Sequence, residues 1–263
     1  AAIILAHYPQ LWPESVRGLL IHSARWTDAM RREFPNNERH SRLRCYGYGV
    51  PDLNRAVWSV ANSATLIVEG EIQPFDKVDG EVKTKDMHLH RVPWPTTLLQ
   101  DLGATEIRMR VTLSYFIEPS PGRRGWTRKH RYQSHGLRFE VKHPLETDLA
   151  FHKRLSRAAW DEEEEQAATI SDDRNWELGH HLRCKGSIHS DTWTGTAAEL
   201  AECGIIAVFP VTGWWKERPH LERWNRKARY SLVVTLETPR TDVDLYTPIA
   251  TQIGVPVQAV IET

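Results

Sequence analysis

The sequence has few cysteines, no excess of charge of either sign and no long apolar run. Its 263 residues include three cysteines, with no Cys-x-x-Cys pair, which disfavours a disulfide framework and predicts reduced thiols in a cytoplasmic compartment. Basic and acidic side chains number 34 each, so no overall field draws the chain to nucleic acid or anionic lipid. The longest apolar stretches, such as GIIAVFPV, are less than half of the roughly 20 residues that a membrane span needs. We therefore expect no membrane contact.

The spacing of apolar residues changes near Asn62 and divides the chain into two parts. Residues 1–62 have helical spacing: an apolar stretch ends at Pro9, and a second helix begins at Pro13, where proline suits the first turn. We expect a loop over FPNNERHS, a short strand at LRCY, a turn with two glycines, and a third helix that starts near Pro51. The apolar residues expected to make the internal contacts of this part are Leu5, Val16, Leu19, Leu20 and Val57.

From residue 64 onward the apolar period becomes two, which is typical of strands with one buried face. The predicted strands are ATLIVEG, MHLHRV, EIRMRVTLSYF, LRFEVK, GIIAVFPVTGWW, RYSLVVTLET and PVQAVIE. In the third of these, alternate residues from Ile107 to Tyr115 share an apolar face. Its opposite face carries the polar residues Arg108, Arg110, Thr112 and Ser114.

These patterns together predict an α+β protein. The short helical part over residues 1–62 is followed by an antiparallel, jelly-roll-like β-sandwich over residues 63–263. The strand signal lapses in a charged insertion near residues 146–171, which we expect to be either a surface helix or a flexible segment.

Three pieces of the first 62 residues resemble the end of the catalytic domain of a subtilisin-like serine protease (peptidase family S8). They are AAIILAHYP, PESVRGLLIHSA and GYGVPDLNRAV, in the family's order and with plausible spacing. In that family the nucleophilic serine of a Gly-Thr-Ser motif starts a helix that ends in an apolar stretch and a proline. The resemblance places that serine roughly ten residues before Ala1, about 15 Å away at the helical rise. Trp12 departs from the family, which usually has Ser or Thr at this N-cap position.

The resemblance implies that the chain is the C-terminal part of such an endopeptidase, with the catalytic Ser, His and Asp all upstream. The upstream catalytic segment would then be its partner. Whether the chain counts as an enzyme is left open, because alone it would be a structural, accessory and inactive piece. SIHSD places Ser187, His189 and Asp191 in one segment, but alternate strand residues point the same way and do not converge into a triad. We expect no catalytic residue, metal ligand or cofactor in this chain.

A basic and aromatic stretch, PGRRGWTRKHRYQSHG, has no acidic residue. A protein partner or a peptide substrate is its favoured occupant; nucleic acid, which also binds basic and aromatic side chains, is less favoured. The possible partner-binding residues are Arg123, Arg124, Trp126, Arg128, Lys129 and Arg131.

Two other clusters leave alternatives open. Trp214, Trp215 and Trp224 would support a carbohydrate- or partner-binding β-sandwich module if they were exposed, although burial in the core is favoured. The segment GHHLRCKGSIH contains residue types that zinc accepts, but its spacing matches no common zinc motif. A position on a sheet surface is favoured for these side chains.

Overall fold

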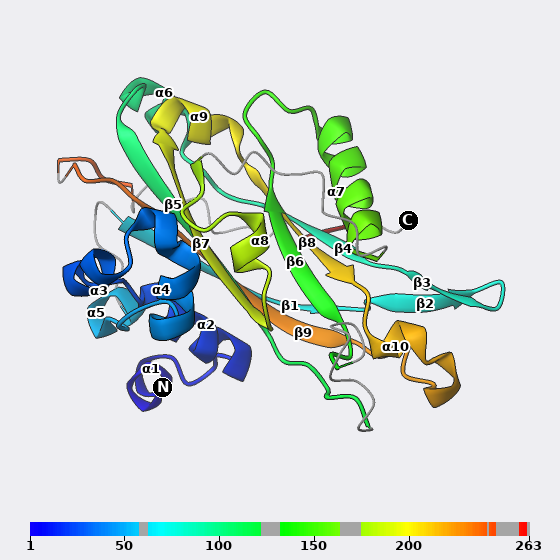
Figure 1. Ribbon diagram of the computed structural model, residues 1–263. Coiled ribbons are helices and arrows are strands. Elements are labelled where there is room, and N and C mark those ends of the chain that lie inside the picture. The colour runs from blue at the N-terminus through cyan, green and yellow to red at the C-terminus, as the bar shows by residue number, and fades with distance from the viewer. Residues whose placement is uncertain (58–62, 122–131, 164–174, 241, 246–257, 262–263) are drawn as a thin grey trace.

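The computed structural model describes residues 1–57, 63–121, 132–163, 175–240, 242–245 and 258–261 (Figure 1). It has a mixed α+β architecture with antiparallel sheets, as the sequence predicted. The first 57 residues form short helices: α1 (Ala2–His7), α2 (Pro13–Ser23), α3 (Asp28–Glu33), the 3-10 helix η1 (Asn36–Glu38), α4 (Arg39–Tyr46) and α5 (Leu53–Val57). No helix of the described segments is long and apolar enough to cross a bilayer.

Two sheets contain most of the strands. The first sheet has the order β1-β9-β5-β7, formed by β1 (Ser63–Ile72), β9 (Ala228–Glu237), β5 (Glu106–Tyr115) and β7 (Ile188–Thr196). The second sheet contains β4 (Met87–Arg91), β8 (Ile205–Val211) and β6 (Gly136–Val141) in that order, and the short β10 (Gln258–Ile261) pairs with β4. A hairpin joins β2 (Phe75–Val78) to β3 (Glu81–Thr84). As far as the strands are described, neither sheet closes into a barrel.

The two sheets share one apolar core. The face of β5 that was predicted to be apolar is fully buried, and Val111 and Leu113 are in one cluster with Phe139 of β6 and Val208 of β8. Burial of aliphatic and aromatic side chains from both sheets provides the main driving force for this arrangement.

Helices cover the outer faces of both sheets (Figure 1). The outer face of the second sheet is covered by α7 (Asp148–Glu163), whose Phe151 and Leu155 pack against Ala207 and Phe209 of β8. The predicted insertion is therefore a surface helix through residue 163. The other helices in the described parts of the chain are α6 (Thr96–Leu102), α8 (His180–Arg183), α9 (Ala197–Glu202), α10 (Trp214–Glu217) and the 3-10 helix η5 (Pro219–Leu221).

The first sheet is covered on its outer face by α2. Val16 and Leu19 of α2 are buried in a cluster with Val57 and with Val233 of β9, as predicted for the first three. The prediction for Leu5 is wrong: its side chain is 43 % exposed, because α1 turns its neighbour Ile4 inward instead.

The prediction for residues 39–46 is also wrong. The sequence suggested a loop and then a short strand at LRCY, whereas residues 39–46 form α4. This helix has few apolar residues and depends on tertiary contacts: the buried Arg42 stacks on the Trp26 ring, 4.3 Å from its centroid, and donates to the Phe34 carbonyl. The expected two-glycine turn follows, with Gly47 and Gly49 at positive φ angles that favour glycine.

Candidate functional site

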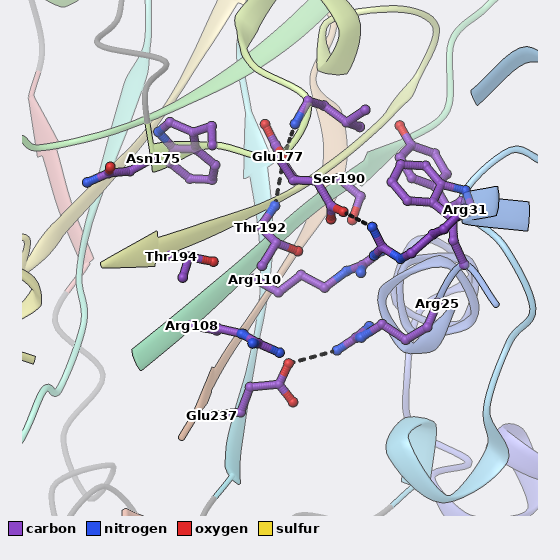
Figure 2. Close-up of a pocket in the computed structure, with 15 residues that line it drawn as sticks. Arg25, Arg31, Arg108, Arg110, Asn175, Glu177, Ser190, Thr192, Thr194 and Glu237 are labelled. Atoms are coloured by element: carbon purple, nitrogen blue, oxygen red, sulfur yellow. Dashed lines mark hydrogen bonds and ion pairs between the residues drawn. The ribbon is translucent and has the colours of Figure 1, made fainter. Parts of the chain in front are cut away.

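A cavity of about 560 Å³ opens on the outer face of the first sheet, beside the N-terminal helices. Its wall comes from three parts of the chain: residues 25–48, strands β5, β7 and β9, and the segment 175–178. Figure 2 shows four guanidinium groups that point toward one another across this space, and we call it the arginine cavity. The four are Arg25, Arg31, Arg108 and Arg110.

Two of these arginines pair with carboxylates that also line the cavity. Arg25 pairs with Glu237 at 3.3 Å, and Glu237 also pairs with Arg55 at 2.9 Å. Arg31 pairs with Glu177 at 2.8 Å. The two cations at Glu237 hold the pKa of that carboxyl below its usual value although burial acts in the opposite direction. Both acids are therefore engaged in the wall of the cavity.

The third acid of the cavity, Asp191, faces backbone rather than arginine. Its carboxylate accepts from the amides of Leu178 at 2.8 Å, Gly179 at 2.9 Å and Thr192 at 2.8 Å. Arg183 approaches it only to 3.7 Å. Burial raises the pKa of Asp191, against the opposing effects of Arg183 and the three amides. Its main role is to anchor the segment 177–179 to β7.

Arg110 is the cation without an acid partner. The residue is 6 % exposed, and its Nη2 donates to the Ile21 carbonyl at 3.3 Å, whereas its Nε has no partner in the described structure. Burial, and then the charge of Arg25, lower the pKa of Arg110 to about 9, so the group remains charged at neutral pH. Arg108, two positions earlier on the same face of β5, is half-exposed and pairs with Glu106 at 2.8 Å.

Aromatic side chains complete the wall. Trp26 and Trp176 line the cavity, and each carries an arginine on its ring: Arg42 on Trp26 and Arg183 on Trp176, at 4.3 and 4.7 Å from the centroids. Such cation–π contacts fix both indoles. Tyr48 donates its hydroxyl to the Ile188 carbonyl at 3.2 Å, and burial raises its pKa to about 12, so the phenol stays neutral.

The residues predicted from the basic stretch cannot be compared with the cavity. Arg123, Arg124, Trp126, Arg128, Lys129 and Arg131 lie outside the described residues.

The SIHSD residues make contacts other than those of a triad. The Ser187 hydroxyl accepts from Arg17 at 3.0 Å, and the His189 ring contacts the Gly186 carbonyl at 3.1 Å. The Asp191 carboxylate accepts the backbone amides described above.

The tryptophan cluster is largely buried. Trp214 and Trp215 are in the core between the sheets, and their indole N–H groups donate to the backbone carbonyl and the carboxylate of Glu118 at 2.9 and 3.1 Å. Trp224 is half-buried against the same core. The favoured expectation, burial, is confirmed for the first two, and these indoles offer no exposed platform for a sugar ring.

His180, His181 and Cys184 lie in or next to α8 rather than on a sheet surface, whereas His189 lies in β7 and is buried. His180 contacts the Glu140 carboxylate at 3.0 Å, and the Cys184 thiol lies 3.8 Å from the His180 ring. The described residues contain no group of three or more potential metal-ligating side chains. All three cysteines are free thiols, and Cys184 and Cys203 are buried.

Sequence reasoning missed the arginine cavity. The available signal was the alternation in EIRMRVTLSYF, which placed Arg108 and Arg110 on one face of a predicted strand. Nothing in the sequence indicated that helices would cover that face.

A scan against protein-family models found no match, and a search of curated proteins found none either.

Proposed function

We propose that this chain is the C-terminal part of a subtilisin-like serine endopeptidase of a reducing, cytoplasmic compartment. Residues 1–62 would complete the catalytic domain, and a jelly-roll-like β-sandwich over residues 63–263 would cover and brace it. The observation that carries the proposal is the order of the N-terminal helices. A helix ends before Pro9, α2 begins with Pro13, and a Gly-x-Gly turn leads to α5, as in the family's pattern.

Contacts between the two parts support a bracing role. Ser15 of α2 donates to the Glu69 carboxylate at 2.5 Å and lies 2.9 Å from the Ser231 hydroxyl. The Glu69 carboxylate also accepts from the Trp12 amide at 2.7 Å, beside the helix start that no side chain caps. Because buried hydrogen bonds are directional, they fix α2 at one position on the sheet.

In this proposal the chain contributes no catalytic group. The hydrolytic serine, its histidine base, the aspartate and the oxyanion hole would come from the upstream segment. Residues of the β-rich part would act on catalysis only through the position of α2 and its neighbours.

The coding sequence before residue 1 provides the first test. We expect a Gly-Thr-Ser motif roughly ten residues, or about three helical turns, before Ala1, with His and Asp motifs further upstream. Absence of that motif would overturn the proposal.

Active-site labelling provides the second test. A fluorophosphonate probe reacts with an activated serine, so it should label the full-length protein, and Ser→Ala in the Gly-Thr-Ser motif should abolish the label. Residues 1–263 alone serve as the control and should remain unlabelled. Labelling of this control would show a serine nucleophile within the chain and contradict the proposal.

A further inference from the structure

We propose that the arginine cavity binds the carboxylate group of a small organic ligand or of a peptide C-terminus, with the Arg110 guanidinium as its anchor. Arg108, which lines the same cavity (Figure 2) and is half-exposed, would be a second contact. This inference does not rest on the protease ancestry.

The first argument is the state of Arg110. A guanidinium has five N–H donors, and this one is 94 % buried yet makes one hydrogen bond, a long one to the Ile21 carbonyl, within the described structure. Its Nε is buried without any partner there. Buried charges are normally paired, because an unpaired one loses its hydration without compensation. An anion in the cavity would supply the missing partner.

The second argument is that the acids of the cavity are engaged elsewhere. Glu237 is held between Arg25 and Arg55, Glu177 pairs with Arg31, and Asp191 accepts three backbone amides. None of them lies within ion-pair distance of Arg110 among the described contacts. The cavity therefore retains one cation for an external anion.

The charge of the lining selects the kind of anion. Four arginines and three carboxylates line the cavity, which leaves one net positive charge. A monoanion neutralises that charge, whereas the second charge of a phosphate dianion would face the three carboxylates. The planar guanidinium also matches a carboxylate in a bidentate arrangement.

The size and the walls of the cavity fit an organic ligand. Ligand pockets have volumes of about 300–1,000 Å³, and this cavity has about 560 Å³. Thr192 and Thr194 of β7 line the cavity and provide hydroxyl groups for polar parts of the ligand. Trp26 and Trp176 belong to the wall, where both are buried and carry arginines on their rings.

The test measures the Arg110 Nε–Hε resonance by NMR in the full 263-residue chain labelled with ¹⁵N-arginine. The peak is assigned by its loss in Arg110→Lys. The probes are benzoate, the free acid of acetyl-Gly-Gly-Phe, the neutral controls benzamide and acetyl-Gly-Gly-Phe amide, and inorganic phosphate. We expect saturable shifts with at least one of the two carboxylates and none with its neutral control. The tighter of the two acids identifies the source, a small carboxylate or a peptide C-terminus.

Variants separate binding from folding. Arg110→Gln should weaken carboxylate binding at least tenfold, as measured by calorimetry with the tighter acid. Because this change is buried, Arg108→Gln provides a second variant at a half-exposed position, with an expected loss of about threefold, or 0.6 to 0.7 kcal/mol at 1.36 kcal/mol per tenfold. Arg240→Gln is the matched control: Arg240 is a half-exposed arginine that pairs with Asp242 outside the cavity, so its loss should leave binding unchanged.

Three outcomes would overturn the inference. One is the absence of any shift with either acid up to 20 mM. Another is equal binding of an acid and its neutral amide, which would show that the carboxylate is not recognised. The third is a shift with phosphate alone, which would assign the cavity to a different anion.

Discussion

The two faces of the first sheet are both buried, but they are made of different side chains. On the inner face, β5 contributes Val111 and Leu113, which are fully buried in the apolar core between the sheets. On the outer face the same strand contributes Thr112 and Ser114, which are fully buried under the N-terminal helices, and Arg110, which is 6 % exposed at the arginine cavity. One strand therefore separates an apolar layer from a polar one.

The polar layer is organised by hydrogen bonds. His22 of α2 contacts Thr112 at 2.8 Å and Thr235 at 2.6 Å, and these hydroxyls contact Ser190 and Thr65 at 2.7 Å each. The chain of contacts runs across all four strands of the sheet. Apolar contacts tolerate small shifts, whereas such a network has one satisfied geometry. The apolar contacts of the inner face hold the two sheets together, and the hydrogen bonds of the outer face fix the position of α2.

The arginine cavity is the part of the outer face that no helix fills. Under α2, Thr112 of β5 is hydrogen-bonded to His22 and Ser190, whereas the Ser114 hydroxyl has no partner in the described structure. The polar series of β5 ends with Arg110 and Arg108 at the cavity. Arg110 therefore lies in a layer whose other β5 residues are also polar. This explains why a buried cation is found on the outer face of the sheet and not on the inner one.

The largest change in the free energy of unfolding is expected from a substitution on the inner face. Leu113→Ala removes a fully buried side chain from the core, and such changes lower the free energy of unfolding by about 3 kcal/mol. Urea unfolding should show a lower midpoint with an unchanged slope. Ile67→Ala on β1, where the side chain is 36 % exposed, is the control and should cost under about 1 kcal/mol. Equal losses at the two positions would contradict the assignment of the inner face as the core.

The second largest expected effect is a loss of folding stability at acid pH, caused by His22, which packs on the outer face. Burial first, then the charges of Arg110 and Arg25, hold the pKa of His22 well below its usual value. The folded state therefore leaves His22 neutral below pH 6.5, while the unfolded state takes up a proton. Stability should fall by about 1.4 kcal/mol per pH unit below pH 6.5 from this residue alone.

A histidine variant isolates this contribution. His90 and His135 also have lowered pKa values, about 4 and about 3, both caused mainly by burial, and they add to the same trend. His22→Gln cannot titrate, so the pH dependence of its unfolding free energy between pH 6 and pH 5 should be smaller by about 1 kcal/mol. Identical slopes for the two proteins would show that His22 is protonated in the folded state.

The parts of the fold that the sequence predicted are those with strong apolar alternation. The prediction ATLIVEG corresponds to β1, EIRMRVTLSYF to β5 and RYSLVVTLET to β9, each with bounds within about two residues. β7 was missed because IHSDTWTGT has polar residues on both faces. Its His189 and Ser190 are buried against partners from β5 and α2 that only the folded chain brings near.

The candidate site could be predicted only in one detail. The alternation in β5 correctly placed Arg108 and Arg110 on one face. Their surroundings depend on α4, a helix with too few apolar residues to be recognised, and on the segment 175–178, which Asp191 holds in place. A cavity made from segments this far apart in sequence leaves no local pattern, because its shape is set by tertiary packing.

The smallest expected change in stability comes from substitutions at Gly18, which test how closely α2 approaches the sheet. Gly18 lies inside α2 on the sheet-facing side, and an added Cβ would meet Val233 Cγ2 at 3.4 Å and Ser114 Cβ at 3.5 Å. These distances allow contact without overlap, and alanine is the better helix former by up to about 1 kcal/mol. Gly18→Ala should therefore raise the free energy of unfolding by about 0.5 kcal/mol, measured by urea titration. Gly18→Leu should lower it, because the longer side chain has to displace α2 from the hydrogen bonds of Ser15 and His22. Destabilisation by alanine would mean that the polar network holds the helix closer to the sheet than these distances indicate.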